Sequence, residues 1–506
     1  MTNQKVKSLT NFQESDFEGL LEEQPLTAAE SYQALLRSLR RKNGFNLLFV
    51  RCSPVQADEI IRGVSQDLPN KNIQVLQLDS ETDNLYEKIV DLPNYTNLNI
   101  LFVCGLENAL LRYEEAESEG YFLSSQSPVY GGTWAGVPKI LGYLNLSRER
   151  FERQFPFTLV FLLPEFALRY FIRRASDFFD WYSGVYEFPT DKDILEREIR
   201  RLVYLDGDLD TYQQFTPQQR QEKLAEIKAY LSDSPSLDPV QTSELWHKKG
   251  LIHQMGKEYE QAIASYDRAL EIKPDDPEAW YNRGIALGNL GRFEQAIASW
   301  DRALEIKPDK HEAWYNRGVA LGNLGRFEEA IASWDRALEI KPDDHLAWYN
   351  RGIALGNLGR LEQAIASYDR ALEFKPDDHL AWYNRGIALG NLGRLEQAIA
   401  SYDRALEIKP DDHLAWYNRG IALGNLGRLE QAIASFDQAI KINSNDADAY
   451  YNKACCYGLQ NNVELAIENL QRAISLDVKY QDMAKTDKDF EQIRGDERFQ
   501  SFLNRV

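Results

Sequence analysis

The stretch Ala279–Arg292, AWYNRGIALGNLGR, decides the fold of the second half of the chain. It recurs, with Val319 as the one difference, at residues 313–326, 347–360, 381–394 and 415–428. Successive copies begin 34 residues apart, and Trp246 and Tyr450 extend the series by one step at either end. A fixed period of this length predicts a tandem array in which neighbouring units bury each other's apolar faces.

Each unit is expected to contain two helices. In the second repeat the first helix is expected over residues 279–291 and the second over residues 293–306. The small residues Gly284 and Ala296 would let the two helices approach closely, while Trp280 and Trp300 would fill the space on either side. Pro308 ends the second helix, because proline cannot continue the hydrogen-bond ladder.

The spacing of Trp, Gly, Ala, aromatic and Pro residues resembles that of the tetratricopeptide repeat, a 34-residue helix–turn–helix unit. The resemblance covers seven units, from about Ser243 to Tyr480, and implies an all-α, right-handed superhelical solenoid with a concave groove. One position departs from the family pattern, because Arg283 and its equivalents stand where the family has Leu. We expect this Arg to lie near the packing seam and to meet an acid such as Asp301 or Glu305 on a second helix.

A helical wheel at 100° per residue divides the first helix of each unit into two faces. Trp280, Gly284 and Leu287 form the packing seam, and the opposite face carries a Tyr, two Asn, an Ile and a Gly. The resemblance implies that this opposite face lines the groove. The candidate binding residues are Tyr281, Tyr315, Tyr349, Tyr383 and Tyr417; Asn282, Asn316, Asn350, Asn384, Asn418 and Asn452; and Asn289, Asn323, Asn357, Asn391 and Asn425.

The asparagines that directly follow the tyrosines would form a ladder along the groove. An amide offers donors and an acceptor, which suits an extended peptide backbone, and the superhelix of the O-linked N-acetylglucosamine transferase uses such a ladder. The alternative is that Asn is simply common at this position and binds water. Repeats that bind charged chaperone tails have Lys at the position of Tyr281 and Asn at that of Ile285. A neutral or apolar extended segment is therefore the favoured partner.

Before Ser243 the pattern changes to short apolar runs that alternate with helical stretches. The runs occupy residues 45–50, 73–78, 99–104, 157–163 and 184–188. Near-continuous apolar strands with helical crossovers predict a buried parallel sheet with helices on both faces, which is a three-layer α/β domain. The fold class expected for the chain is therefore an α/β domain followed by an all-α solenoid.

The order of these elements looks like the P-loop domain of signal-transduction ATPases, over about Ala28 to Pro189. Its catalytic parts do not carry over. A phosphate-binding loop needs G-x-x-x-x-G-K-[ST] after the first strand, but the chain reads RCSPVQAD there, and Cys104 stands where the family has an Asp for Mg²⁺. We expect a degenerate nucleotide site at Cys52, Ser53, Cys104 and Glu107, with no catalytic residues, no metal and no cofactor.

The expected domain boundaries follow from these changes of pattern. Residues 1–26 would be a flexible N-terminus, 27–190 the degenerate P-loop-like domain and 191–242 a helical connector and linker. Seven repeats would fill 243–480, and a capping helix would cover the last repeat over 481–506.

The composition limits the classes of partner. A net charge of −20 disfavours nucleic acid, because binding needs Lys and Arg to displace counterions from phosphates. No run is apolar enough to span a bilayer, and the four cysteines lack metal-ligand spacing, so we expect a cytoplasmic protein. The sequence favours a protein-interaction scaffold, with a homo-oligomer left open, over the alternative of a nucleotide-dependent switch regulated through the repeats.

Overall fold

The computed structural model describes residues 27–41, 44–79, 81–111, 138–189, 197–202, 209–233 and 237–505. The chain divides into two compact units, Met1–Ala286 and Leu287–Val506. The expected flexible N-terminus, residues 234–236 of the expected linker, and the segment 112–137 lie outside the described residues.

The first unit contains the five-stranded parallel sheet that the sequence predicts. Its strands are β1 (Asn46–Arg51), β2 (Ile73–Gln77), β3 (Ile100–Cys104), β4 (Thr158–Leu163) and β5 (Gly184–Glu187). They lie in the order β2-β3-β4-β1-β5, and every pair is parallel. Strand β1 therefore lies inside the sheet, with its carboxyl end beside that of β4.

Helices cover both faces of this sheet, as the near-continuous apolar strands require. On β1, Leu48 and Val50 face a core shared with α2 (Ala28–Arg41) and α3 (Pro54–Asp67). Leu47 and Phe49 point to the opposite face, because side chains alternate along a strand. The helices over that face are α4 (Leu85–Val90), α6 (Lys139–Gln154), α7 (Glu165–Arg174) and α8 (Ser176–Phe179), and η1 (Tyr95–Asn97) lies beside them. The domain thus has three layers.

The connector joins the core of this domain. Helix α11 (Pro217–Asp233) follows the short α10 (Leu209–Gln213) and begins with a capping box, in which the Gln219 amide donates to Thr216 Oγ1 at 3.2 Å and the Thr216 amide donates to Gln219 Oε1 at 2.9 Å. Tyr230 of α11 and Ile252 of α12 (Pro239–Met255) are buried in the same core as the sheet. The first unit therefore continues through α13 (Tyr259–Ile272) into α14 (Pro277–Asn289).

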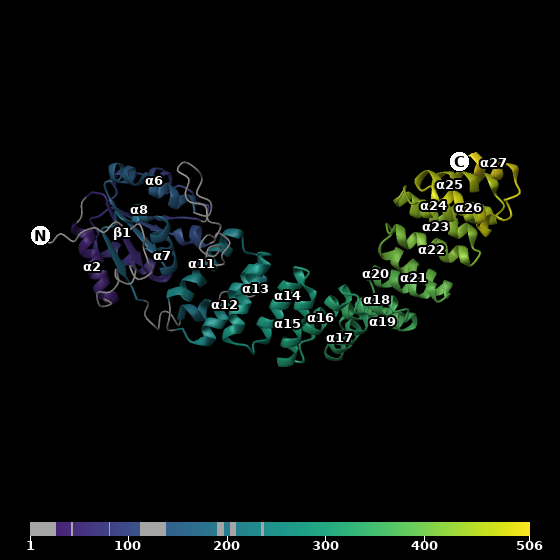
Figure 1. The fold of residues 1–506 in the computed structure, drawn as a ribbon, viewed down its shortest axis with the longest axis horizontal. Coiled ribbons are helices and arrows are strands. Elements are labelled where there is room, and N and C mark those ends of the chain that lie inside the picture. Colours follow the sequence, from purple (N-terminus) through teal and green to yellow (C-terminus); the bar gives the residue numbers. More distant parts are fainter. Residues whose placement is uncertain are drawn as a thin grey trace. The chain divides into compact units, whose positions relative to one another are not determined.

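The second unit is a succession of helix pairs, one pair per 34-residue repeat (Figure 1). The helices are α15 (Phe293–Ile306), α16 (His311–Asn323), α17 (Phe327–Ile340), α18 (His345–Asn357), α19 (Leu361–Phe374), α20 (His379–Asn391), α21 (Leu395–Ile408), α22 (His413–Asn425), α23 (Leu429–Ile442), α24 (Ala447–Leu459) and α25 (Val463–Leu476). Each helix packs on the next along the chain. The predicted helical repeat array is confirmed.

Local sequence sets where these helices begin and end. Asp344 caps α18, because its carboxylate accepts the backbone amides of Leu346 and Ala347 at 3.1 and 3.2 Å. Gly359 follows α18 with a φ of +72°, which favours glycine. The Arg360 amide then reaches back to the Leu355 carbonyl at 2.9 Å and closes the helix.

In the four copies that begin at residues 313, 347, 381 and 415, the first Gly lies under an aromatic ring of the paired helix. A Cβ on Gly352 would be 2.6 Å from Tyr368 Cε1, and Gly318 has the same relation to the Trp334 ring. This close approach is the reason for a glycine inside a helix, where it costs about 1 kcal/mol. The tryptophan of the first helix is only half-buried, and the Trp348 indole donates to the Pro342 carbonyl at 2.9 Å.

The end of the chain packs on the last repeat. In place of the one capping helix expected over 481–506, it forms α26 (Lys479–Thr486), η3 (Lys488–Phe490) and α27 (Glu497–Arg505). The helix breaks at Asp487, whose backbone is extended and whose carboxylate caps η3. Phe490 and Phe499 are fully buried in a core shared with α24 and α25, which excludes water from the open end of the array.

Candidate functional site

A hollow of about 320 Å³ lies between the first helices of two successive repeats in the second unit. Three residues of the predicted groove face of α16 line it, namely Val319, Gly322 and Asn323, and Asn350, Ile353 and Asn357 of α18 lie opposite. Phe327 and Trp334 of α17 also line it, as does Ala354 of α18. The wheel did not find the two aromatic residues, because it treats one helix alone. Their aromatic character was the available signal.

The asparagine ladder is tied to the tyrosines of the preceding repeat. Each Asn Nδ2 donates to the hydroxyl of the Tyr one repeat earlier: Asn350 to Tyr315 at 3.1 Å, Asn384 to Tyr349 at 2.9 Å, Asn418 to Tyr383 at 3.0 Å and Asn452 to Tyr417 at 3.2 Å. In the first unit, Asn282 lies 3.0 Å from His247 Nε2 instead. Asn316 is half-buried. The sequence predicted that the asparagine amides would donate to a ligand, and it gave no sign of this pairing with tyrosine.

The pairing determines which polar atoms stay available. The tyrosine hydroxyls act as acceptors toward Asn, and Tyr315, Tyr349, Tyr383 and Tyr417 donate no hydrogen bond to any described residue. Burial and nearby carboxylates raise their pKa, to about 12 for Tyr417, so the protons remain at neutral pH. Each repeat thus presents a tyrosine O–H donor, and an Asn Oδ1 acceptor beside it.

The second asparagine of the motif lies at the rim of this face. Asn289, Asn323, Asn357, Asn391 and Asn425 are all exposed. Asn323 donates to the Val319 carbonyl of its own helix at 3.0 Å, which keeps the side chain along the helix. Gly356, between the two asparagines of α18, has open space where a Cβ would be. No contact with the described residues requires that glycine.

The arginine of the motif has a structural role, as predicted. Arg351 Nε lies 2.6 Å from Asp335 Oδ1 of the preceding repeat, and Nη1 donates to Ser367 of its own repeat at 2.7 Å. Its guanidinium also lies over the Trp348 ring, 5.6 Å from the centroid. The partner in each case is the Asp one repeat earlier, so Asp301 pairs with Arg317 and Asp267 pairs with Arg283. Glu305, the other acid considered, pairs with Arg302.

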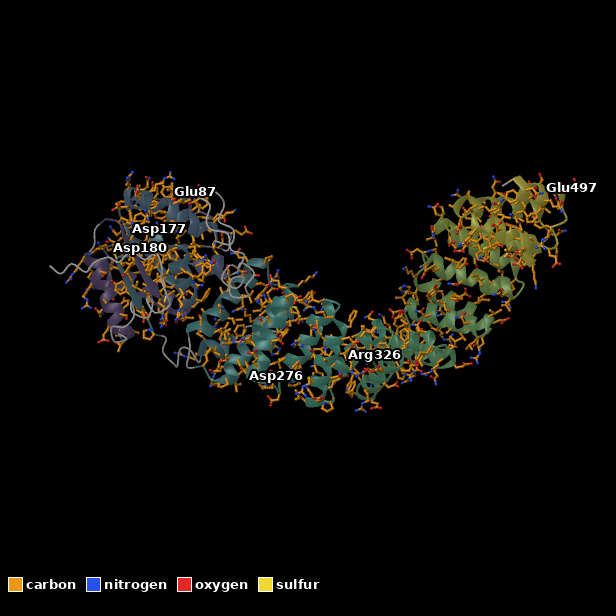
Figure 2. All side chains as sticks on the ribbon, in the orientation of Figure 1. Glu87, Asp177, Asp180, Asp276, Arg326 and Glu497 are labelled. Carbon is orange, nitrogen blue, oxygen red and sulfur yellow. The ribbon has the colours of Figure 1, made fainter. Side chains whose placement is uncertain are left out.

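A second set of ion pairs joins successive repeats at the surface. Arg326, labelled in Figure 2, precedes α17 and pairs with Glu329 at 2.6 Å and with Glu294 of the preceding repeat at 3.1 Å. The equivalents Arg394–Glu362 and Arg428–Glu396 are 2.7 and 3.5 Å apart. All are well exposed, so each contributes little to stability.

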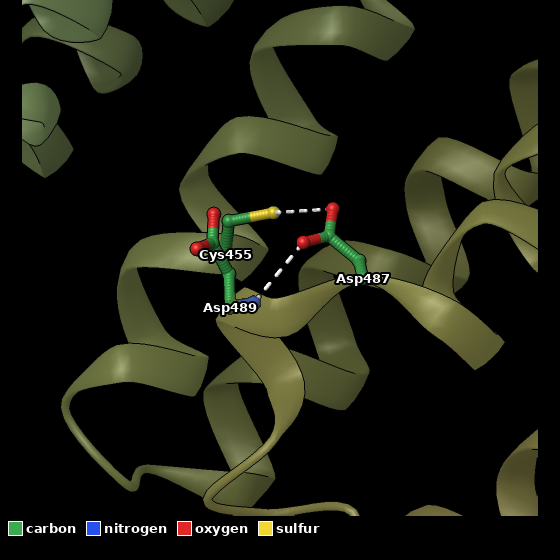
Figure 3. Close-up of side chains that lie close together, drawn as sticks. All are labelled: Cys455, Asp487 and Asp489. Carbon is green, nitrogen blue, oxygen red and sulfur yellow. Dashed lines mark hydrogen bonds between the residues drawn. The ribbon is translucent and has the colours of Figure 1, made fainter.

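Cys455, Asp487 and Asp489 form a cluster with possible metal-ligand atoms within 4.8 Å of one another (Figure 3). Hydrogen bonds account for it. The Tyr451 hydroxyl donates to Asp487 at 2.6 Å, and the Asp489 amide donates to the same carboxylate at 3.0 Å. Burial and the two carboxylates raise the pKa of Cys455, so its thiol stays protonated and points to Asp487. The cluster caps the array.

In the first unit, all four residues of the predicted degenerate site line one cleft of about 250 Å³ at the carboxyl ends of β1 and β3. Cys52, Ser53, Cys104 and Glu107 are joined there by Asp58 of α3, which the sequence reasoning missed. Ser53 begins α3, and its backbone amide already donates to Gln56 Oε1 at 3.0 Å. This amide is therefore not available to a phosphate. The acidic residues Glu114, Glu115 and Glu117 and the Gly131–Gly136 loop lie outside the described residues.

Among the described residues, no helix has the length and apolar character needed to cross a bilayer.

Comparisons with known proteins identify the repeats. Models described as tetratricopeptide repeat match residues 281–345, 315–379, 349–413, 413–446 and 447–480, and one described as TPR repeat matches 253–291. A search of curated proteins finds no match. The tetratricopeptide repeats expected from the sequence are thus confirmed for this part of the chain.

Several solved structures are similar to parts of the chain. YrrB, described as a TPR protein with an unusual peptide-binding site, is 26% identical with a TM-score of 0.35, covering 37% of this chain and 97% of its own. MamA from Desulfovibrio magneticus is 22% identical with a TM-score of 0.32, covering 34% of this chain and 96% of its own. The C-terminal part of a TPR repeat-containing protein from Cytophaga hutchinsonii is 18% identical with a TM-score of 0.42, and the match covers 50% of this chain and 99% of that structure.

Proposed function

Residues 253–480 are tetratricopeptide repeats, and from this premise we propose that the protein is an interaction scaffold whose repeats bind an extended segment of a protein or peptide. The observation that carries the proposal is the row of tyrosine hydroxyls, each held by an asparagine of the next repeat and each keeping its proton. Four equivalent pairs in the second unit offer the same donor and acceptor in register.

The spacing of these pairs suits an extended chain. Packed helices lie about 8–10 Å apart, and an extended backbone advances about 3.3 Å per residue. About three residues of ligand would therefore span one repeat. A backbone carbonyl at every third residue would accept from a tyrosine hydroxyl, and a backbone N–H beside it would donate to Asn Oδ1.

The side chains around these pairs favour an apolar or neutral ligand. Ile353, Gly322 and Trp334 line the hollow between α16 and α18. Leu346, Leu380 and Leu414 stand at the second position of their helices, on the same predicted face, and remain 44, 45 and 47% exposed. An aliphatic or aromatic side chain of the ligand would bury this surface and gain roughly 25 cal/mol for each Å² removed from water.

We also propose that the N-terminal α/β domain is a catalytically inactive relative of P-loop ATPases. Two facts support this. The cleft at the carboxyl end of β1 contains Asp58 and Glu107 but no Lys or Arg among its described lining residues. The Ser53 amide, at the start of α3, is already bonded to Gln56. ATP hydrolysis by the purified chain that disappears in Glu107→Gln would contradict the proposal and favour the nucleotide-dependent switch.

The groove is tested with partners captured by the full chain from native lysate and identified by mass spectrometry. Affinity for a captured partner is then measured for Tyr349→Phe with Tyr383→Phe, and separately for Asn350→Ala with Asn384→Ala. We expect each pair of changes to weaken binding about tenfold or more, because it removes hydrogen bonds at two adjacent repeats.

The matched control is Tyr402→Phe on α21. Tyr402 is buried against Gly386, the change keeps its ring and removes only the hydroxyl, and the next repeat already has Phe436 at the equivalent place. This change should leave affinity and melting temperature unaltered. Equal affinity in all the variants would remove the tyrosine–asparagine row from the binding site.

A further inference from the structure

The cleft of the N-terminal domain has an acidic part and an apolar part to its lining. Cys52 after β1, Cys104 at the end of β3 and Glu107 just after β3 lie together in the lining, and Glu107 makes it acidic. Ile61 of α3, Val75 of β2 and Leu162 of β4 belong to the apolar part of the lining. A volume of about 250 Å³ holds a small molecule, since one water occupies about 30 Å³ of liquid.

One oxygen atom of an acidic side chain in this cleft lacks a hydrogen-bond partner among the described residues. Glu107 Oε2 is buried and forms no hydrogen bond, whereas the backbone amides of Gly105 and Glu107 itself interact with the carboxylate. An unpartnered buried carboxylate oxygen is costly, and native structures have few of them. Among the described residues, no group of the domain donates a hydrogen bond to this oxygen. A ligand that brings a donor would remove the cost of burying the carboxylate.

The charges around Glu107 restrict the ligand. Asp58 faces the cleft from α3, and the pKa of Cys104 is raised to about 12 by burial and by Glu107 and Asp58. Its thiol is therefore neutral, and the lining described carries negative charge only. A phosphate or carboxylate would be repelled here, and a cation would be attracted.

A metal ion does not fit this geometry. Among the described residues, the Cys455 cluster is the one group that brings three possible ligand atoms within 4.8 Å of one another. Cys52, Cys104 and Glu107 do not meet that condition, and a metal needs its ligand atoms about 2 Å from one centre. An organic cation needs less, because one hydrogen bond and an apolar wall suffice to orient it.

We propose that this cleft is a binding site for a small organic cation, a primary ammonium carried on an apolar body. The ammonium donates to the Glu107 carboxylate, and Asp58 adds a second negative charge to the lining. The apolar body lies against Ile61, Val75 and Leu162. The site goes beyond the scaffold function, because it belongs to the α/β domain and needs no part of the repeats.

The test is calorimetric titration of the full chain with benzylamine at pH 6, 7 and 8, beside benzyl alcohol and magnesium ADP. Burial raises the pKa of Glu107 to about 7, so its carboxylate forms over this range while the amine stays charged. Benzylamine affinity should rise with pH. Benzyl alcohol, which has nearly the same shape without the charge, and magnesium ADP should bind at least about tenfold more weakly.

Three variants make the result specific to the cleft. Glu107→Gln should weaken benzylamine binding about 10- to 100-fold, since it removes a charge-assisted hydrogen bond, and should abolish the pH dependence. Asp58→Asn should weaken binding several-fold. Glu87→Gln, which changes an exposed acid of α4 (Figure 2), should have no effect and controls for general attraction to an acidic protein.

Equal binding to the wild type and Glu107→Gln would overturn the proposal, as would the absence of benzylamine binding or tighter binding of magnesium ADP. If Glu107→Gln does not fold, judged by its circular dichroism, the pH dependence of the wild type and the Asp58→Asn variant decide the question.

Discussion

The sharpest test of the repeat packing uses two glycines of one helix. Gly352 and Gly356 are one turn apart on α18, and both can be changed to Ala. A new Cβ at Gly352 would be 2.6, 2.8 and 2.9 Å from three atoms of the Tyr368 ring, which is closer than Cβ atoms approach. A new Cβ at Gly356 would meet nothing within 4 Å.

The expected free energies follow from two terms. Ala is favoured over Gly inside a helix by about 1 kcal/mol, and this gain is common to both variants. Overpacking costs about 1–3 kcal/mol and applies only to Gly352→Ala, because Tyr368 is buried and cannot swing away. The two variants should therefore differ by about 1–3 kcal/mol in free energy of unfolding, with Gly356→Ala more stable than the wild type.

The assay is thermal unfolding of the full chain followed by circular dichroism, with hydrogen exchange of peptides from α18 and α19. For a unit of this size, about 1 kcal/mol shifts the melting temperature by roughly 2–4 °C. Gly352→Ala should melt lower and exchange faster in α18 and α19, and Gly356→Ala should do neither. Equal melting temperatures and exchange rates would refute the assignment of the first glycine to close packing.

Three further predictions concern charge and protonation. Arg351→Met should lower the free energy of unfolding by about 1–2 kcal/mol, because the half-buried guanidinium bonds both Asp and Ser, whereas Arg370→Met, which loses an exposed pair, should change it by less than about 0.5 kcal/mol in the same urea titration. The raised pKa of Glu107 lets the folded domain hold a proton that the unfolded chain releases between pH 4.5 and about 7, so the free energy of unfolding falls as pH rises through this window. Glu107→Gln should therefore raise the melting temperature at pH 8 and raise it much less at pH 5. A larger increase at pH 5 than at pH 8 would contradict the burial of this carboxyl. Burial and nearby acids raise the pKa of Cys455 and, to about 12, that of Cys456, so iodoacetamide at pH 8 should label neither until urea unfolds the array, as peptide mass spectrometry would show.

The periodic elements could be predicted because their signals are local. Leu47 to Val50 are apolar without interruption, which is typical of a strand buried on both faces, and this run is β1. The 34-residue step predicted every helix pair, and Asp344 and Gly359 gave signals for a beginning and an end that depend on a few neighbouring residues. The break at Asp487 was missed because its carboxylate caps a turn that is fixed by packing on the last repeat.

The candidate sites were predicted as faces and strand ends rather than as contacts. The wheel put Tyr349 and Asn350 on one face of a helix, but it could not show that Asn384 of the next repeat donates to Tyr349. Likewise, the order of elements brought Cys52 and Cys104 to the carboxyl edge of the sheet. It could not show that Glu107 Oε2 would be buried there without a donor.

The sequence by itself determined the kinds of element, the repeat period, and the residues that share a helix face, because each depends on spacing along one chain. Only the tertiary structure decided which polar atoms are used up. Hydrogen bonds between repeats join residues on different helices, so one N–H of each asparagine is taken by a tyrosine oxygen, while the tyrosine keeps a proton that it donates to no described residue. Burial works in the same way, because it depends on every neighbour in space, and it raises the pKa of Glu107 to about 7.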